Sequence, residues 1–162
     1  MLIQSNNIAS HNDGLLKKHQ NKLIFTASEI GETEAIIQKL IDFQIAIPSW
    51  ALGTGGTRFG RFPGGGEPRS LEEKIEDVGL LHALNNASGA ISLHIPWDIP
   101  TDYNAIKTLA AQHNLKFDAV NSNTFQDQNS QEHTYKFGSL QNVNKAVRKQ
   151  AINHTIEVIK QG

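Results

Sequence analysis

Cysteine is absent from this chain of 162 residues, so neither disulfides nor thiolate-bound metals are available to it. An excess of one charge is also lacking: 15 basic and 16 acidic residues leave a formal net charge of −1, which favours neither nucleic acid nor an anionic membrane. No apolar run approaches the ~20 residues of a membrane span. The N-terminal sequence MLIQSNNIASHNDG lacks the basic start and apolar core of a signal peptide. We therefore expect a soluble, cytoplasmic, globular protein.

Grouped metal ligands are scarce as well. The sequence has seven histidines but no HExxH motif and no histidine pair at the i, i+4 spacing of a helix. Among acidic residues near the predicted strand ends, Asp98 stands almost alone, and Asp118 lies inside a predicted strand. A divalent-cation site needs several carboxylates or imidazoles that converge. We therefore expect no metal to bind to this chain by itself.

Three short apolar runs bounded by turn residues predict strands at 43–50, 90–98 and 116–124. Helical periodicity lies before, between and after them. The predicted helices cover 32–41, a segment capped by Ser70, a segment capped by Asp102, and 142–160. This alternation is typical of a parallel sheet with right-handed crossovers. The apolar stripes of the second and fourth helices are expected to cover one face of the sheet; their members are Ile75 and Val78, and Ile152, Ile156 and Ile159.

The segment PSWALGTGGTRFGRFPGGGEPRS (48–70) holds seven of the thirteen glycines and three of the four arginines. It follows the first predicted strand, so it leaves the carboxyl-terminal rim of the sheet, where α/β folds bind ligands. A phosphate-binding loop is disfavoured because Gly60 is followed by Arg61 and Phe62 rather than by lysine and a hydroxyl residue. Exposed aromatics instead favour a loop that covers a pocket or reaches a neighbouring subunit.

Several residues at the strand ends are candidates for chemistry. His94 ends the second predicted strand, and an imidazole there can exchange a proton near neutral pH, although a packed core histidine is the structural alternative. The two tryptophans, Trp50 and Trp97, follow strand-terminal prolines and suit either core packing or an aromatic wall against a sugar. The third strand ends in NSNTF, which includes Asn123 and Phe125 and offers hydrogen bonds to a polyol.

The segments IPSWALGTGGTRFGRFPGGGEPR, SLHIPWD, FDAVNSNTF and HTYKFGSL resemble, in order, the N-terminal part of L-rhamnose isomerases, in the xylose-isomerase-like barrel superfamily. The resemblance runs from about Phe43 to the end. It implies a (β/α)8 TIM barrel, two divalent ions such as Mn²⁺, and interconversion of an aldose with its ketose, L-rhamnose with L-rhamnulose.

The resemblance also implies roles for single residues. His94 is similar to the histidine that contacts the sugar near C1 and assists ring opening. Trp50 and Trp97 resemble pocket walls, and Phe59 resembles a loop phenylalanine that shields the substrate of an adjacent subunit. A homo-oligomer, a tetramer in this family, is then expected through the Gly53–Arg69 loop.

The chain departs from the family in length, because a barrel takes about 250 residues or more. We expect 1–42 to be an N-terminal helical extension and 43–162 the first three strands of an α/β barrel, a parallel βαβαβα unit. The metal ligands would then lie on later strands, and this chain alone would be an inactive fragment. Two alternatives stay open: a non-catalytic α/β sugar-binding or assembly module, and a metal-free sugar-phosphate isomerase with His94 as the enediol base.

Overall fold

The structure is a computed structural model, and it describes residues 4–30, 34–53, 56–57, 60–61 and 65–162. Five α-helices, one short 3₁₀ helix and two groups of strands make up this part of the chain. The helices are α1 (Ser5–Ile30), α2 (Glu34–Ile41), η1 (Ser49–Ala51), α3 (Leu71–Asn85), α4 (Tyr103–Gln112) and α5 (Lys145–Gln161). The strands are β1 (Ala46–Pro48), β2 (Gly56–Thr57), β3 (Gly60–Arg61), β4 (Ala90–Ile95) and β5 (Lys116–Ser122).

The main sheet has three parallel strands in the order β1-β4-β5, so the predicted α/β class with a parallel sheet is confirmed. The sheet is open, with β1 and β5 at its edges. The first strand is shorter than predicted because η1 begins directly after Pro48. A small antiparallel pair, β2 and β3, lies within the glycine-rich segment and was not predicted.

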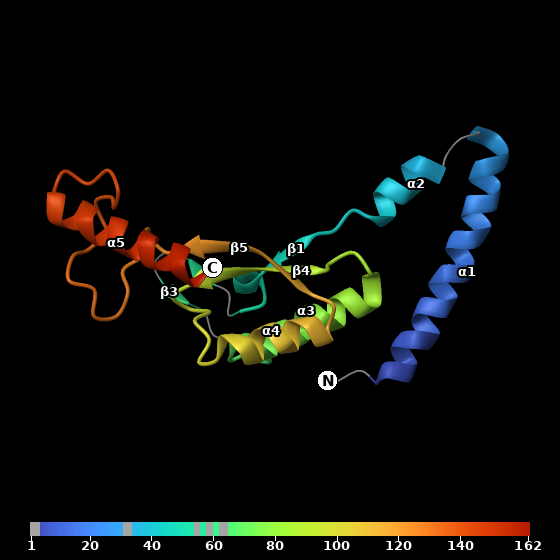
Figure 1. Cartoon of the computed structure of the whole chain (residues 1–162), viewed down its shortest axis with the longest axis horizontal. Coiled ribbons are helices and arrows are strands. Elements are labelled where there is room, and N and C mark those ends of the chain that lie inside the picture. The colour runs from blue at the N-terminus through green and yellow to red at the C-terminus, as the bar shows by residue number, and fades with distance from the viewer. Residues whose placement is uncertain (1–3, 31–33, 54–55, 58–59, 62–64) are drawn as a thin grey trace.

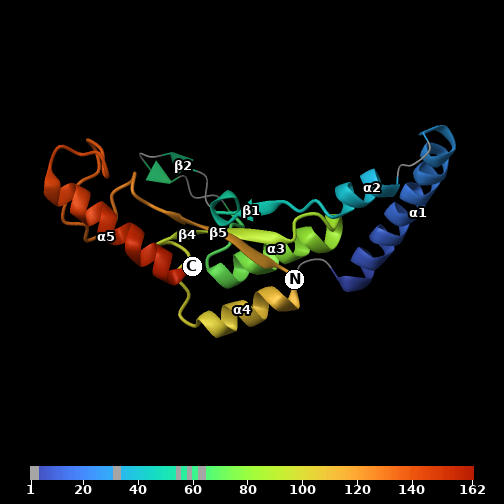
Figure 2. The same ribbon diagram turned by 45° about the horizontal axis from the view of Figure 1, so that its top comes forward.

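Helices α3 and α4 cover one face of the sheet, as Figures 1 and 2 show. Their core surrounds Ile91 of β4, which is fully buried together with Ile75 and Val78 of α3. Each large aliphatic side chain buried in this way contributes about 1.5–3 kcal/mol. Both predicted caps form: Ser70 Oγ accepts from the Glu73 N–H, and Asp102 accepts from two N–H groups of the first turn of α4. The local signals thus placed these helices correctly.

The prediction that Ile152, Ile156 and Ile159 cover the sheet is wrong, since these side chains are 48, 45 and 73% exposed. Helix α5 lies beside the edge strand β5 and buries Val147, Ala151 and Val158 instead. A helix of 17 residues is about 25 Å long. The edge of a three-stranded sheet is too small a surface to cover the whole apolar side of helix α5.

The N-terminal helices extend away from the sheet (Figure 1). Helix α1 touches α3, where Asn12 Nδ2 donates to the Ala83 carbonyl at 2.8 Å, and helix α2 has no buried residue. Within the extension predicted over 1–42, residues 5–30 and 34–41 are helical, whereas its status as a separate domain stays a prediction. No helix in the described ranges combines the length and the apolarity needed to cross a membrane.

Candidate active site

The carboxyl-terminal ends of β1, β4 and β5 bring a group of aromatic side chains around one histidine. The His94 ring stacks on Trp97 with centroids 4.2 Å apart and planes 14° apart. Trp50, from η1, meets the same ring edge-on at 5.3 Å, and Phe125, just after β5, does so at 5.9 Å. We call these four residues the rim cluster. Four of the six residues predicted for the site therefore lie together.

Exposure differs sharply within the rim cluster. His94 is 2% exposed, whereas Trp50, Trp97 and Phe125 are 42, 37 and 53% exposed. The aromatic rings thus form an open surface with the imidazole at its base. Such an arrangement offers apolar faces for stacking against a ligand and one imidazole, a side chain of the kind that acts as a general acid or base. His94 lies on the sheet face opposite α3 and α4, because it alternates along β4 with Leu93, which packs against the core beneath these helices.

Asn121 of β5 contacts the histidine ring directly. It is the residue paired with His94 across the two parallel strands, and its Nδ2 lies 3.3 Å from His94 Nδ1. Asn121 is the first residue of the NSNTF segment, but it was not among the predicted site residues. The pairing register was the missing information, and it includes an irregularity between Ile91 and Leu93 that shifts the alignment.

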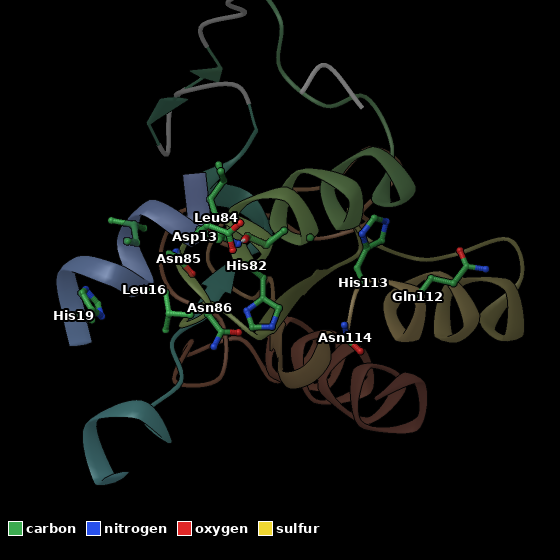
Figure 3. Close-up of a pocket in the computed structure, with 14 residues that line it drawn as sticks. Asp13, Leu16, His19, His82, Leu84, Asn85, Asn86, Gln112, His113 and Asn114 are labelled. Carbon is green, nitrogen blue, oxygen red and sulfur yellow. Dashed lines mark hydrogen bonds between the residues drawn. The ribbon is translucent and has the colours of Figure 1, made fainter. Parts of the chain in front are cut away.

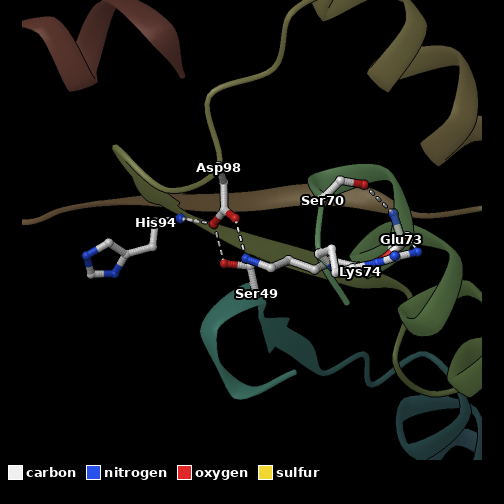
Figure 4. Close-up of polar contacts among 7 residues, drawn as sticks. Ser49, Ser70, Glu73, Lys74, His94 and Asp98 are labelled. Carbon is white, nitrogen blue, oxygen red and sulfur yellow. Dashed lines mark hydrogen bonds and ion pairs between the residues drawn. The ribbon is translucent and has the colours of Figure 1, made fainter. Parts of the chain in front are cut away.

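A buried carboxylate, that of Asp98, holds together the elements that carry the rim cluster. Asp98 is 1% exposed and accepts three hydrogen bonds, from Ser49 Oγ, from the His94 backbone N–H at 2.7 Å and from Lys74 Nζ at 2.6 Å (Figure 4). We call these residues the Asp98 hub. It ties η1, the end of β4 and helix α3 to one point. Because Trp50 and Trp97 are the direct neighbours of Ser49 and Asp98 in the sequence, the hub also fixes the backbone positions of both tryptophans.

Asn123, predicted to bind substrate, is 1% exposed and lies beneath the strand end rather than on the aromatic surface. Its N–H donates to the Ile95 carbonyl at 3.1 Å, and its Oδ1 accepts from the Gln126 N–H at 3.2 Å. These bonds cap the end of β5. Its Nδ2 is buried without a hydrogen-bond partner in the part of the chain that the structure describes. Phe59 lies outside the described residues, so its predicted role is not addressed by the structure.

The loop that carries Phe125 is closed by Asp127. This carboxylate accepts from Thr134 Oγ1 and from the Tyr135 N–H, both at 2.6 Å, and the bond from the Thr134 hydroxyl is the main reason why the pKa of Asp127 is lowered. Tyr135, 5% exposed, packs against α5. The loop is therefore anchored to α5 by both a polar and an apolar contact.

Arg69, in the glycine-rich segment, pairs with Glu73 of α3 at 2.9 Å. Its side-chain and backbone hydrogen bonds lower the pKa of Glu73, and the same pairing raises the pKa of Arg69. Both groups face solvent, and such exposed pairs contribute little to stability.

The described residues do not fit a divalent-cation site. In these ranges no three histidine, aspartate or glutamate side chains gather in a way that would hold a metal ion. The nearest carboxylates have other partners: Asp98 belongs to the hub, and Asp118 accepts from Ser92 Oγ at 3.2 Å.

A cavity of about 500 Å³ lies between α1 and the C-terminal ends of α3 and α4 (Figure 3). These helix ends lead into the first residues of β4 and β5, so the cavity is at the opposite end of the sheet from the rim cluster. His19, His82 and His113 are among the residues that line it. It takes no part in the site described above.

No protein-family model matches this chain. Two curated proteins are similar to it. The Probable sugar isomerase R00627 of Rhizobium meliloti (strain 1021) is 44% identical over 154 residues, which cover 95% of this chain and 36% of the relative. The Probable sugar isomerase mlr5709 of Mesorhizobium japonicum is 50% identical over 129 residues, which cover 80% of this chain and 30% of the relative.

The chain thus spans about one third of the length of the curated relatives that it matches. It is homologous, over most of its own length, to part of two probable sugar isomerases. This agrees with the coarser expectation from the sequence, that of a sugar isomerase. Neither relative's name specifies a sugar.

Proposed function

We propose that this chain is the N-terminal portion of a metal-dependent aldose–ketose isomerase of the L-rhamnose isomerase type, which interconverts L-rhamnose and L-rhamnulose. The observation that carries the proposal is the rim cluster, a buried imidazole surrounded by three half-exposed aromatic rings. The similarity to part of two probable sugar isomerases supports the same function.

In this proposal the aromatic rings bind the apolar C–H face of the sugar, and His94 moves a proton near C1 as the cyclic sugar opens. Proton transfer by a positioned imidazole contributes typically about 10²–10⁴-fold to a rate. The Asp98 hub keeps the two tryptophans in register around that imidazole. Binding and proton transfer near C1 are therefore the tasks of this chain's own residues.

The metal ions, manganese or similar, belong in this proposal to ligands outside the chain, since its described residues gather no fitting group. We also propose that the Gly53–Arg69 loop contributes to a homo-oligomer, with Phe59 reaching the site of a neighbouring subunit. The glycine and aromatic content of the segment supports this part of the proposal.

A chimera tests the function. Residues 1–162 replace the matching segment of the Rhizobium meliloti relative, and ketose formation from L-rhamnose is measured with Mn²⁺. We expect turnover that falls about 10²–10⁴-fold with His94→Asn. A folded chimera that binds Mn²⁺ but converts no aldose, L-rhamnose included, would show that the proposal is wrong.

The second candidate is a non-catalytic sugar-binding module. It is favoured by one observation, that three aromatic side chains already surround His94 within this chain alone. Saturable quenching of tryptophan fluorescence by free sugars, in the chain alone, together with an inactive chimera, would support this second function.

A further inference from the structure

The two nitrogens of the His94 ring are chemically distinct, and the hydrogen bond at one decides whether the other carries the proton. Here Nδ1 faces the side-chain nitrogen of Asn121 at 3.3 Å. An amide nitrogen donates and does not accept hydrogen bonds. With the Asn121 amide oriented as it is in the structure, Nδ1 is the acceptor, and the proton of the neutral ring is then on Nε2.

The surroundings of the ring oppose a half-turn that would exchange the places of Nδ1 and Cδ2. Trp97 stacks on one face of the ring, and Trp50 and Phe125 meet it edge-on. A half-turn about the Cβ–Cγ bond would keep the ring plane but would place a carbon, Cδ2, against the Asn121 amide. The hydrogen bond would then be lost, so the observed orientation and the tautomer support one another.

The charged groups around this part of the sheet have other partners. On β4, Asp98 accepts from the backbone N–H of His94 rather than from its ring, and Lys74 of α3 lies 2.6 Å from that carboxylate. On β5, Asp118 accepts from Ser92. Among the contacts of the described residues, it is the neutral amide of Asn121 that lies against Nδ1.

We propose that Asn121 is a positioning residue that holds His94 as its Nε2–H tautomer and thereby makes Nε2 the proton-donating atom of the rim cluster. The inference rests on the proposed function only where it concerns the sugar, which would meet Nε2 as a hydrogen-bond donor and acid. The assignment of the tautomer itself depends on the Asn121–His94 contact alone.

Magnetic resonance on the 162-residue chain with ¹⁵N-labelled histidine tests the assignment. The His94 signals are identified by their loss in His94→Asn, and long-range ¹H–¹⁵N correlations report which nitrogen carries the proton. We expect Nε2–H in the unchanged chain. Asn121→Leu, which offers no hydrogen bond, is expected to populate both tautomers.

Asn121→Asp reverses the direction of the hydrogen bond to His94 Nδ1, because a carboxylate only accepts hydrogen bonds. It is expected to move the proton to Nδ1 and to raise the midpoint pH of the His94 titration by about 1 pH unit or more. The control Asn153→Asp makes the same change of charge at an exposed position of α5 and is expected to leave the ring signals unchanged. Amide dispersion in each spectrum shows that the variants fold.

The inference is wrong if the unchanged chain carries its proton on Nδ1, or if Asn121→Asp alters neither the tautomer nor the titration midpoint. In the chimera, Asn121→Asp is expected to lower kcat with little change in KM and to shift the pH profile of kcat. If the resonance results appear as expected while the chimera is inactive, the tautomer assignment stands and the proposed function fails. The two claims are therefore tested separately.

Discussion

Replacing Asp98 by alanine is expected to destabilise the protein more than any exposed substitution would. The change removes the acceptor of three donors, Ser49 Oγ, the His94 N–H and Lys74 Nζ. Breaking a buried ion pair by removing one partner costs about 3–5 kcal/mol, and each buried donor left without an acceptor costs about 1–3 kcal/mol. The Lys74 side chain is 13% exposed and regains some solvent, which places the ion-pair part at the low end of its range; with the two other donors added, we expect a total loss of about 5 kcal/mol or more.

Urea unfolding followed by tryptophan fluorescence measures this loss, because both tryptophans lie next to the hub. Asp118→Ala is the matched control, since this exposed carboxylate has one hydrogen bond at 3.2 Å; it is expected to cost no more than about 0.5 kcal/mol. A double variant, Asp98→Leu with Lys74→Met, removes both charges and is expected to recover the ion-pair part of the loss, whereas the Ser49 hydroxyl and the His94 N–H still lack their acceptor. Equal effects of Asp98→Ala and Asp118→Ala would refute the reasoning.

Three further predictions follow from the site and the surface. Calorimetric titration of the chain with Mn²⁺ is expected to show no stoichiometric site, and no ketose should form from L-rhamnose; a tight one-to-one site would contradict this. The folded-state pKa of Asp127 is lowered, so its contribution to stability is present above its unfolded pKa and is lost as the pH falls through the folded pKa. Asp127→Asn should therefore flatten the acid limb of the stability profile, and an unchanged limb would argue against the hydrogen bonds to Asp127. Because Ile152, Ile156 and Ile159 are exposed, the chain should bind a hydrophobic dye, and Ile156→Lys with Ile159→Lys should reduce the bound fluorescence; unchanged dye binding would mean that this face is covered in solution.

The sequence predicted those parts of the fold that depend on near neighbours. Ser70 and Asp102 cap their helices through groups two or three residues away, so their patterns are readable in the chain itself. The meeting of His94 with Trp50 and Trp97 was also predictable. The carboxyl ends of parallel strands lie at one edge of the sheet, and all three residues lie at or just after such a strand end, so they were expected near one another.

What the sequence could not show depends on distant partners and on register. Asp98 meets Ser49 and Lys74, which are 49 and 24 residues away in the chain and carry no pattern that links them. The contact of Asn121 with His94 requires the β4–β5 register, which an irregularity shifts. The exposure of the α5 isoleucines has a third cause: periodicity identifies an apolar stripe but not the surface that is present to cover it.

The most direct test of the central claim is the ring-opening step in the chimera. Turnover of cyclic L-rhamnose is compared with turnover of the open-chain form, for His94 and for His94→Asn. If His94 moves a proton near C1 as the ring opens, kcat/KM for the cyclic sugar should fall about 10²–10⁴-fold while open-chain turnover falls much less. If kcat/KM is nearly the same with His94 and with His94→Asn for both forms of the sugar, the rim histidine is only structural and the assignment of this site to sugar isomerisation is wrong.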